Sequence, residues 1–99
     1  MRRAAKVDEN QAEIVAALRK VGCTVQSLAA IGNGCPDLLV GVAGKTLLME
    51  IKDGKKVKSK QALTPDQLGW HGAWRGGALE VVDSIDSAIR MVNTTRSEA

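Results

Sequence analysis

Three charged residues lie at the ends of two apolar stretches that follow one another in the sequence. Asp37 opens the stretch 37–42 (DLLVGV), while Glu50 and Lys52 stand at the end of the stretch 45–51 (KTLLMEI) and just beyond it. Only two residues separate the stretches, which predicts two strands joined by a tight turn. Two carboxylates and a lysine held together would suit chemistry on a phosphate, because Mg²⁺ and Mn²⁺ bind through carboxylates, waters and substrate phosphates.

The spacing predicts that the two acids face each other. A turn centred between residues 43 and 44 pairs residues that lie equally far from it, so Asp37 falls opposite Glu50. Opposed residues point to the same side of the sheet with Cβ atoms about 4.5–5.5 Å apart. Lys52 lies two residues beyond Glu50 and therefore shares that side.

Two carboxylates at this separation repel each other by roughly 3 kcal/mol at an effective dielectric constant of about 20. A proton on one acid, a bridge through Lys52 or a divalent cation would each relieve the repulsion. A cation would also polarise a phosphate and lower the pKa of a bound water. The alternative is that Asp37 merely starts a strand, while Glu50 and Lys52 form a surface ion pair. The combination of Pro36-Asp37, two apolar strands and matching register favours the metal site.

A helix is predicted before these strands. Asp8 and Gln11 have the spacing of a capping box, apolar residues then recur at helical spacing, and Gly22 is placed to end the helix. Residues 23–29 are predicted to form a strand and residues 30–36 a loop. The lysine-rich segment after the third strand is predicted to be a loop as well.

The second half of the chain predicts a helix, a strand and a helix. Thr64 suits an N-cap, Pro65 the first helical position, and Gln67 completes a capping box. A strand over 78–83 and a final helix capped by Ser84 follow, and the tail 93–99 is expected to be frayed. The crossover into the fourth strand makes it parallel to the third. The fold class is therefore α/β, a small mixed sheet with helices on both faces and a C-terminal helix.

The composition indicates one domain spanning residues 1–99, with an aliphatic core, because the chain has only two aromatic residues, both tryptophans. No apolar run approaches the roughly 20 residues that a membrane span needs, and the basic start lacks the apolar stretch of a signal peptide. These features predict an intracellular protein with no membrane partner. Cys23 and Cys35 are expected to be free thiols rather than a disulfide or a zinc site.

The net charge is +3, and much of the positive charge follows the acidic pair. A lysine-rich loop is most often only solvated. Its position directly after Glu50 and Lys52 favours contacts with nucleic-acid phosphates, made by Lys55, Lys56, Lys58 and Lys60. A second basic group, Arg2, Arg3 and Lys6, is the alternative site for such contacts.

The second helix also carries three ring side chains. Trp70 and Trp74 are expected to pack on the sheet, with stacking on nucleic-acid bases as the less favoured role. His71 is expected to pack between them rather than to act as a general base.

Taken together, these motifs resemble the PD-(D/E)xK nuclease superfamily, with Pro36-Asp37 as the first motif and Glu50-Ile51-Lys52 as the second. The element order matches the restriction-endonuclease-like αβββαβ core of that superfamily. The segments GNGCPDLLVG, MEIKDG and LTPDQLGWHGAW followed by EVVDS resemble the stand-alone VRR-type nuclease domains of phage, and beyond them the archaeal-type Holliday-junction resolvases.

The resemblance implies a role for each site residue. Asp37, Glu50 and the Ile51 carbonyl would bind Mg²⁺ or Mn²⁺, Lys52 would assist catalysis, and the second helix would turn Gln67 toward the site. Resolvase relatives carry a first-helix glutamate eleven residues before the glycine that ends the helix. Counting back from Gly22 reaches Gln11, which can bind a metal-bound water but brings no charge.

The resemblance also implies a function. The chain is expected to be a metal-dependent DNA endonuclease, selective for branched or junction DNA, acting as a homodimer in the cytoplasm of a bacterium or phage-infected cell. The alternatives are a DNA-binding module that keeps the nuclease fold without cleaving, and a structural subunit of a larger replication or packaging complex.

Overall fold

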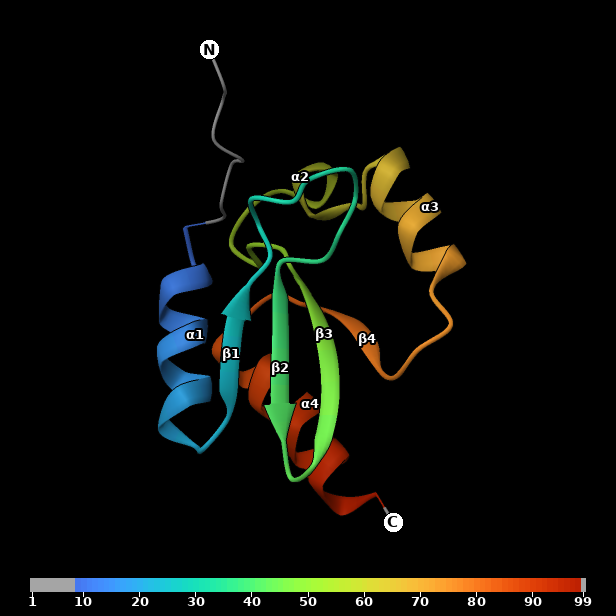
Figure 1. Ribbon diagram of the computed structural model, residues 1–99. Helices are drawn as coiled ribbons and strands as arrows, with labels where there is room; N and C mark the ends of the chain where they lie inside the picture. The colour runs from blue at the N-terminus through green and yellow to red at the C-terminus, as the bar shows by residue number, and fades with distance from the viewer. Residues whose placement is uncertain (1–8, 99) are drawn as a thin grey trace.

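The computed structural model describes residues 9–98, with the side chain of Lys60 excepted. Figure 1 shows the helices and strands in the order that the sequence predicts, with one short additional helix after the third strand. They are α1 (Gln11–Lys20), β1 (Thr24–Ser27), β2 (Leu38–Val42), β3 (Lys45–Ile51), α2 (Lys58–Gln61), α3 (Pro65–Ala73), β4 (Leu79–Val82) and α4 (Ile85–Ser97).

The strands form one mixed sheet in the order β1-β2-β3-β4. The pairs β1/β2 and β2/β3 are antiparallel, whereas β3/β4 is parallel, as the crossover through α2 and α3 predicts. Ala43 and Gly44 have positive φ angles of 52° and 76°. Two successive residues in the left-handed conformation favour a two-residue hairpin turn, because the twist of such a turn matches the twist of the antiparallel strands that it joins. The observed register, with Val42 opposite Lys45 and Val40 opposite Leu47, is the predicted one.

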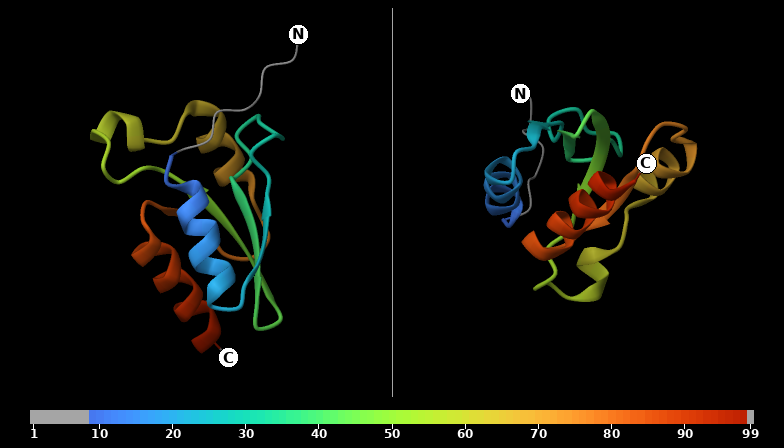
Figure 2. Two further views of the ribbon diagram at one scale, coloured as in Figure 1. Left: turned by 90° about the vertical axis from the view of Figure 1, so that its left-hand side faces the viewer. Right: turned by 90° about the horizontal axis from the view of Figure 1, so that it is seen from below.

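The two faces of the sheet are covered differently. On one face, alternate residues of β3 (Leu47, Met49 and Ile51) join a core of aliphatic side chains contributed by all four strands, α1 and α4. Figure 2 shows α1 and α4 side by side against this sheet. On the other face, α3 lies near Glu50, and the covering is thinner: Leu39 remains 37% exposed and Val81 43%. Helices therefore flank both faces, but the α3 face is partly open.

Local capping explains where the later helices begin. The Thr64 hydroxyl accepts from the Gln67 N–H, and the Gln67 side chain accepts from the Thr64 N–H, so the predicted capping box is formed. Ser84 caps α4 through an analogous pair of contacts with Ser87. α1 differs, because Asn10 occupies its N-cap position without a side-chain cap. The predicted cap residue Asp8 lies outside the described residues.

Two predictions about irregular segments are wrong. The tail predicted to be frayed continues α4 as far as Ser97, because Thr95 is buried and Lys45 Nζ donates to the carbonyls of Thr95 and Glu98 (2.8 and 2.5 Å). A cation on the last carbonyls of a helix stabilises its C-terminus. The lysine segment, predicted as a loop, contains the one-turn helix α2.

Across residues 9–98, no helix has the length and apolar character that crossing a bilayer requires. Cys23 and Cys35 are both free thiols, as predicted.

Candidate active site

Asp37 lies just before β2, at the end of the sheet where the loop 28–36 joins it. Its backbone N–H donates to the Met49 carbonyl (3.1 Å), and its Oδ2 accepts from the Ile51 N–H at 2.7 Å. The regular ladder ends at the Leu38–Met49 pair, so the strict pairing of Asp37 with Glu50 that the sequence predicts is not formed. Beyond the last ladder pair, the Asp37 carboxylate is oriented instead by the backbone N–H of Ile51, at the end of β3.

Glu50 and Lys52 are buried rather than exposed. Glu50 is 1% exposed and Lys52 8% exposed. Burial of ionisable side chains is costly unless polar partners compensate them. The surface ion pair considered as the alternative is therefore wrong, and the two residues need contacts from elsewhere in the fold.

Gln67 on α3 supplies these contacts. Its Nε2 donates to Glu50 Oε2 at 3.1 Å, while its Oε1 accepts from Lys52 Nζ at 2.9 Å. The same Oε1 accepts from the Thr64 N–H at 2.9 Å, so the capping box fixes the amide in the orientation that serves both charged residues. Both roles expected for Gln67, as cap partner and as site residue, are thus combined in one side chain.

His71 lies one helical turn after Gln67 and also faces Glu50. Its Nε2 is 3.5 Å from Glu50 Oε1, and its side chain is 16% exposed. The pKa of His71 is lowered from its ordinary value of 6.5. Burial of the imidazole is the larger cause, and the positive charge of Lys52 is the smaller one. The lowered pKa favours the uncharged form of the ring. As expected, His71 packs against Trp70, edge-on and with ring centroids 6.5 Å apart. Its approach to Glu50 is an additional contact, which the four-residue spacing from Gln67 could have indicated because it puts both residues on one helix face.

Cys35 lies in the loop that leads to Asp37. Burial raises the pKa of its thiol, and the negative charges of Glu50 and Asp37 raise it further. Gly34, directly before Cys35, closely approaches α3: an added Cβ would lie 2.2 Å from the Asp66 carbonyl oxygen. This close approach shows that the loop 28–36 packs against the first turn of α3.

Gln11 is buried near this cluster without joining it. Its Nε2 lies 3.5 Å from the Ser27 hydroxyl, at the end of β1, and its Oε1 has no hydrogen-bond partner among the described residues. Asn10, at the N-cap of α1, is linked to the residue that follows β3, because its Nδ2 donates to the Lys52 carbonyl at 3.2 Å. The start of the first helix thus contacts the backbone of Lys52 through the side chain of Asn10.

The predicted DNA-binding lysines follow the site along the chain. Lys55 and Lys58 are exposed and Lys56 half-exposed, whereas the side chain of Lys60 is not among those described. Lys55 lines a groove together with several acids, so its charge is partly compensated within the protein. Arg2, Arg3 and Lys6 lie outside the described residues.

The donor set suits a hard cation. Two carboxylates and the Ile51 carbonyl are all oxygen ligands, the type that Mg²⁺ and Mn²⁺ prefer. Within residues 9–98, no three His, Cys, Asp or Glu side chains gather to hold a metal ion by themselves. Mg²⁺ usually keeps several waters and uses only one or two carboxylates. The residues present therefore fit a weakly held, partly hydrated ion.

Trp70 and Trp74 stack on each other, with ring centroids 5.2 Å apart and an interplanar angle of 16°. α3 has no buried residue, and Trp74 is 38% exposed. The tryptophans are expected to pack on the sheet; the ring contacts that they make among the described residues are with each other and with His71.

The fold and site thus define an α/β domain with two acids, a lysine and a glutamine at one end of its central strands. Comparison with protein-family models, with curated proteins and with solved structures finds no match for this chain.

Proposed function

We propose that this protein is a metal-dependent DNA endonuclease that hydrolyses phosphodiester bonds. The observation that supports this proposal most directly is the pair of hydrogen bonds by which Gln67 holds the buried Glu50 and Lys52. Burying a glutamate and a lysine is costly, and holding them with a glutamine is an arrangement that stability alone does not require. The motifs Pro36-Asp37 and Glu50-Ile51-Lys52, which resemble those of PD-(D/E)xK nucleases, point the same way.

Each residue has a role in this proposal. Asp37, Glu50 and the Ile51 carbonyl would hold Mg²⁺ or Mn²⁺, and the bound ion would supply positive charge to polarise the scissile phosphate and make an attacking water more acidic. Lys52 stabilises negative charge that develops on the phosphate. Gln67 positions both Glu50 and Lys52, and Gln11 contributes a neutral hydrogen bond. In the reaction, a water oxygen bonds to phosphorus, the bond to one ester oxygen breaks, and the leaving oxygen takes up a proton.

The substrate and assembly are part of the same proposal. A chain of 99 residues covers little of a DNA duplex, so a homodimer with two sites, one for each strand, suits branched or junction DNA, and closed dimers are the commonest small assembly. We place the activity in phage or bacterial replication, recombination or repair, in the cytoplasm.

The decisive experiment incubates the purified protein with end-labelled duplex, flap and four-way-junction DNA in Mg²⁺, Mn²⁺ or EDTA. Cleavage with either ion and none in EDTA is expected, and faster cleavage of the branched substrates is expected to show the selectivity. Cleavage that continues unchanged in EDTA would contradict the metal-dependent mechanism. Size-exclusion chromatography with light scattering measures the oligomeric state directly.

A DNA-binding module without cleavage is the second candidate. The observation in its favour is Gln11, whose side chain lies against Ser27 and brings no negative charge to the acids. Salt-sensitive DNA binding without cleavage in any metal would support it.

A further inference from the structure

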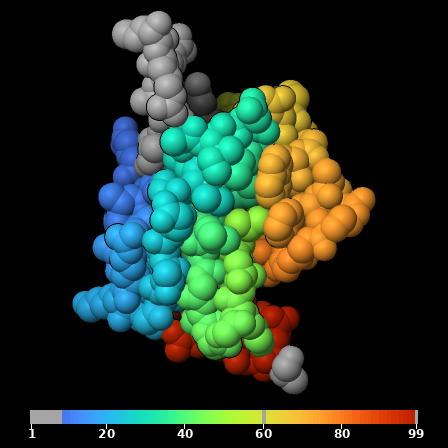
Figure 3. All heavy atoms as spheres, in the orientation of Figure 1, coloured from blue at the N-terminus to red at the C-terminus, as the bar shows by residue number. Residues whose placement is uncertain are grey.

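The two tryptophans of α3 form a stacked pair that is partly open to solvent. The ring centroids of Trp70 and Trp74 lie 5.2 Å apart. Trp74 is 38% exposed, and a hollow of about 140 Å³ lies against both rings and Ala73. Figure 3 shows α3 at the edge of the molecule, beside the loop 28–36, and in this view none of the other described elements covers its outer side. Tryptophan is enriched at binding surfaces because its ring combines a large apolar face with a polar N–H.

The Trp74 ring is fixed in place although it is exposed. Its Nε1 donates to the Gly77 carbonyl at 2.8 Å. Gly76 packs closely on the same ring, since an added Cβ at that position would lie 2.2 Å from Cζ2. A ring that is already fixed loses little rotamer freedom when a flat ligand stacks on it. The pair is therefore preorganised for stacking.

The two rings lie on the same side of α3 as the residues that contact Glu50. Gln67 donates to Glu50 Oε2, and His71 lies 3.5 Å from Oε1. At about 100° per residue, the four positions 67, 70, 71 and 74 fall within about 100° of the helix circumference. At about 1.5 Å per residue, Trp70 lies about 4.5 Å and Trp74 about 10.5 Å along the axis from Gln67. Stacked bases of one strand lie about 3.4 Å apart, so the rings are within reach of bases about one to three nucleotides from a phosphate held at the acids.

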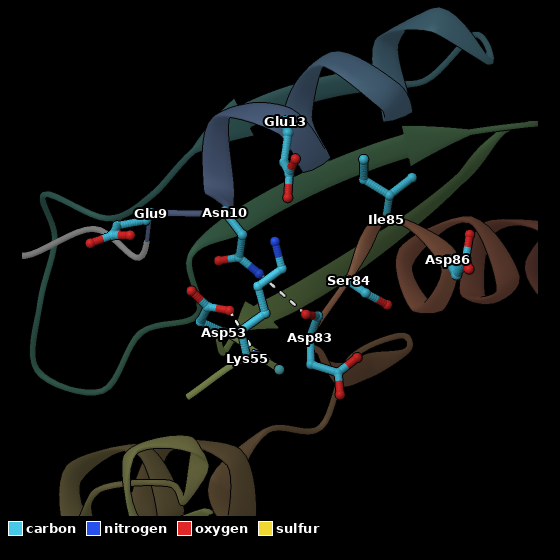
Figure 4. Close-up of a pocket in the computed structure, with 10 residues that line it drawn as sticks. Glu9, Asn10, Glu13, Asp53, Lys55, Asp83, Ser84, Ile85 and Asp86 are labelled. Atoms are coloured by element: carbon cyan, nitrogen blue, oxygen red, sulfur yellow. Dashed lines mark hydrogen bonds between the residues drawn. The ribbon is translucent and has the colours of Figure 1, made fainter. Parts of the chain in front are cut away.

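Charge favours the α3 side as the path of a nucleic acid. On the side of the sheet that α1 and α4 cover, a groove of about 670 Å³ lies between the first turns of these helices (Figure 4). It is lined by five acids and one lysine, namely Glu9, Glu13, Asp53, Asp83, Asp86 and Lys55. Such a concentration of acids repels phosphates. Beside the rings, by contrast, Arg75 Nη1 donates to the carbonyls of Gly72 and Trp74 at 2.9 and 3.1 Å, which keeps an exposed positive charge next to the tryptophan pair.

We propose that the Trp70–Trp74 pair stacks on an unpaired base of the DNA bound at the candidate active site. This inference rests on the proposed function and names its substrate class, which is DNA with unpaired bases about one to three nucleotides from the scissile phosphate. A paired base inside a duplex offers only its edges, because its faces stack on its neighbours. An unpaired base in a flap or an opened junction offers a free face. Stacking of one such face on an aromatic side chain strengthens binding by roughly 5- to 150-fold.

Abasic DNA tests the stacking directly, because it lacks the bases and keeps the phosphates. A flap with a natural single-stranded arm is compared with the same flap carrying an abasic arm, by equilibrium binding in Ca²⁺. The wild-type chain is expected to bind the natural arm at least about 5-fold more tightly. Trp74→Leu keeps the apolar bulk and loses the aromatic face, so this ratio should fall to about one. Trp74→Phe should restore part of it, because it keeps an aromatic face.

Leu68→Ala is the matched control, because it removes another exposed apolar side chain of α3, one that is 59% exposed. The ratio of affinities for the two arms should keep its wild-type value in this variant. Equal affinity of the wild-type chain for both arms would overturn the proposal, and so would an unchanged ratio in Trp74→Leu.

Tryptophan fluorescence gives a second readout, because the chain contains no tryptophan outside this pair. At saturating DNA, the natural arm is expected to quench the emission more strongly than the abasic arm. Equal quenching by the two arms would contradict stacking. Emission that changes with protein concentration in the absence of DNA would assign the pair to contact with a second copy of the chain and would equally overturn the proposal.

Cleavage in Mg²⁺ separates this inference from the proposed function. If the natural and abasic flaps are bound and cleaved equally well, the stacking is wrong and the endonuclease remains. If the natural arm is bound more tightly but no DNA is cleaved in Mg²⁺ or Mn²⁺, the endonuclease is wrong and the stacking remains, as part of a DNA-binding module.

Discussion

Gln67 Nε2 donates to Glu50 Oε2 at 3.1 Å and so joins α3 to β3. The contact spans 17 residues of sequence and fixes a buried carboxylate from outside the sheet. Because Gln67 is itself held by the cap of α3, the position of Glu50 depends on how that helix begins. The first three predictions test this arrangement.

Replacement of either acid should abolish cleavage while DNA binding remains. Asp37→Ala and Glu50→Ala are each expected to reduce the cleavage rate at least about 100-fold, because each removes a negative oxygen ligand from the proposed metal site. Rates with labelled DNA in Mg²⁺ and equilibrium binding measured in Ca²⁺ separate the two effects. Glu80→Ala, on an exposed acid of β4, is the matched control. Wild-type rates in both site variants would remove the metal-site interpretation.

Lys52→Ala should lower turnover roughly 100-fold and change metal affinity by less than about threefold, since a protonated lysine stabilises charge but does not ligate a cation. Gln67 Oε1 keeps its bond from the Thr64 N–H in this variant, so Glu50 should stay in position. Metal titrations of the cleavage rate give both quantities. If the apparent metal affinity falls as far as turnover does, Lys52 acts by holding the acids instead.

Gln67→Ala is expected to reduce turnover by about 10- to 100-fold, because small displacements of catalytic groups cost that much. It should also cost about 1 kcal/mol of stability through loss of the cap. Thr64→Ala is the control, because it removes the hydroxyl that accepts from the Gln67 N–H and leaves the Gln67 side chain in place. If both variants lose similar stability but only Gln67→Ala loses turnover, Gln67 positions the site in addition to capping the helix. Equal turnover in the two variants would show that Gln67 serves only the cap.

The lysines after β3 should set the salt dependence of DNA binding. Each phosphate contact contributes a slope of about −0.9 to log K against log salt. Alanine at Lys55, Lys56, Lys58 and Lys60 together should flatten this slope and leave turnover at saturating DNA nearly unchanged. Lys55→Ala alone should contribute least, because Lys55 lies among the acids of the groove. An unaltered slope in the quadruple variant would move the DNA contacts elsewhere.

His71 should make the fold less stable in mild acid. Its folded-state pKa lies below the ordinary value of 6.5, so the unfolded chain binds a proton more tightly than the folded chain. The free energy of unfolding should therefore be full above pH 6.5, fall as the pH drops from there toward the folded-state pKa, and level off below it. Denaturant unfolding in EDTA across this range measures the fall. His71→Gln should remove this part of the pH dependence, and an unchanged profile in the variant would assign it to another group.

Local chemistry within the sequence determined the hairpin and the helix starts. The two-residue turn at Ala43-Gly44 sets the register of β2 and β3 as far as Leu38, because a hairpin's register follows from its turn. The capping box at Thr64 forms as its three-residue spacing predicts, and Ser84 caps α4 as expected. These features depend on neighbours in sequence, so they could be predicted from it.

The tertiary structure alone decided what surrounds the acids. The burial of Glu50 and Lys52, the approach of His71 and the contact of Asn10 with the Lys52 carbonyl each depend on how helices dock on the sheet. The slip at Asp37 depends on the Ile51 N–H that attracts its carboxylate, and the extension of α4 depends on Lys45 reaching its last carbonyls. These contacts join residues 14 to 53 positions apart. Spacing in the sequence does not fix such contacts, because packing of the core sets the distance between the elements.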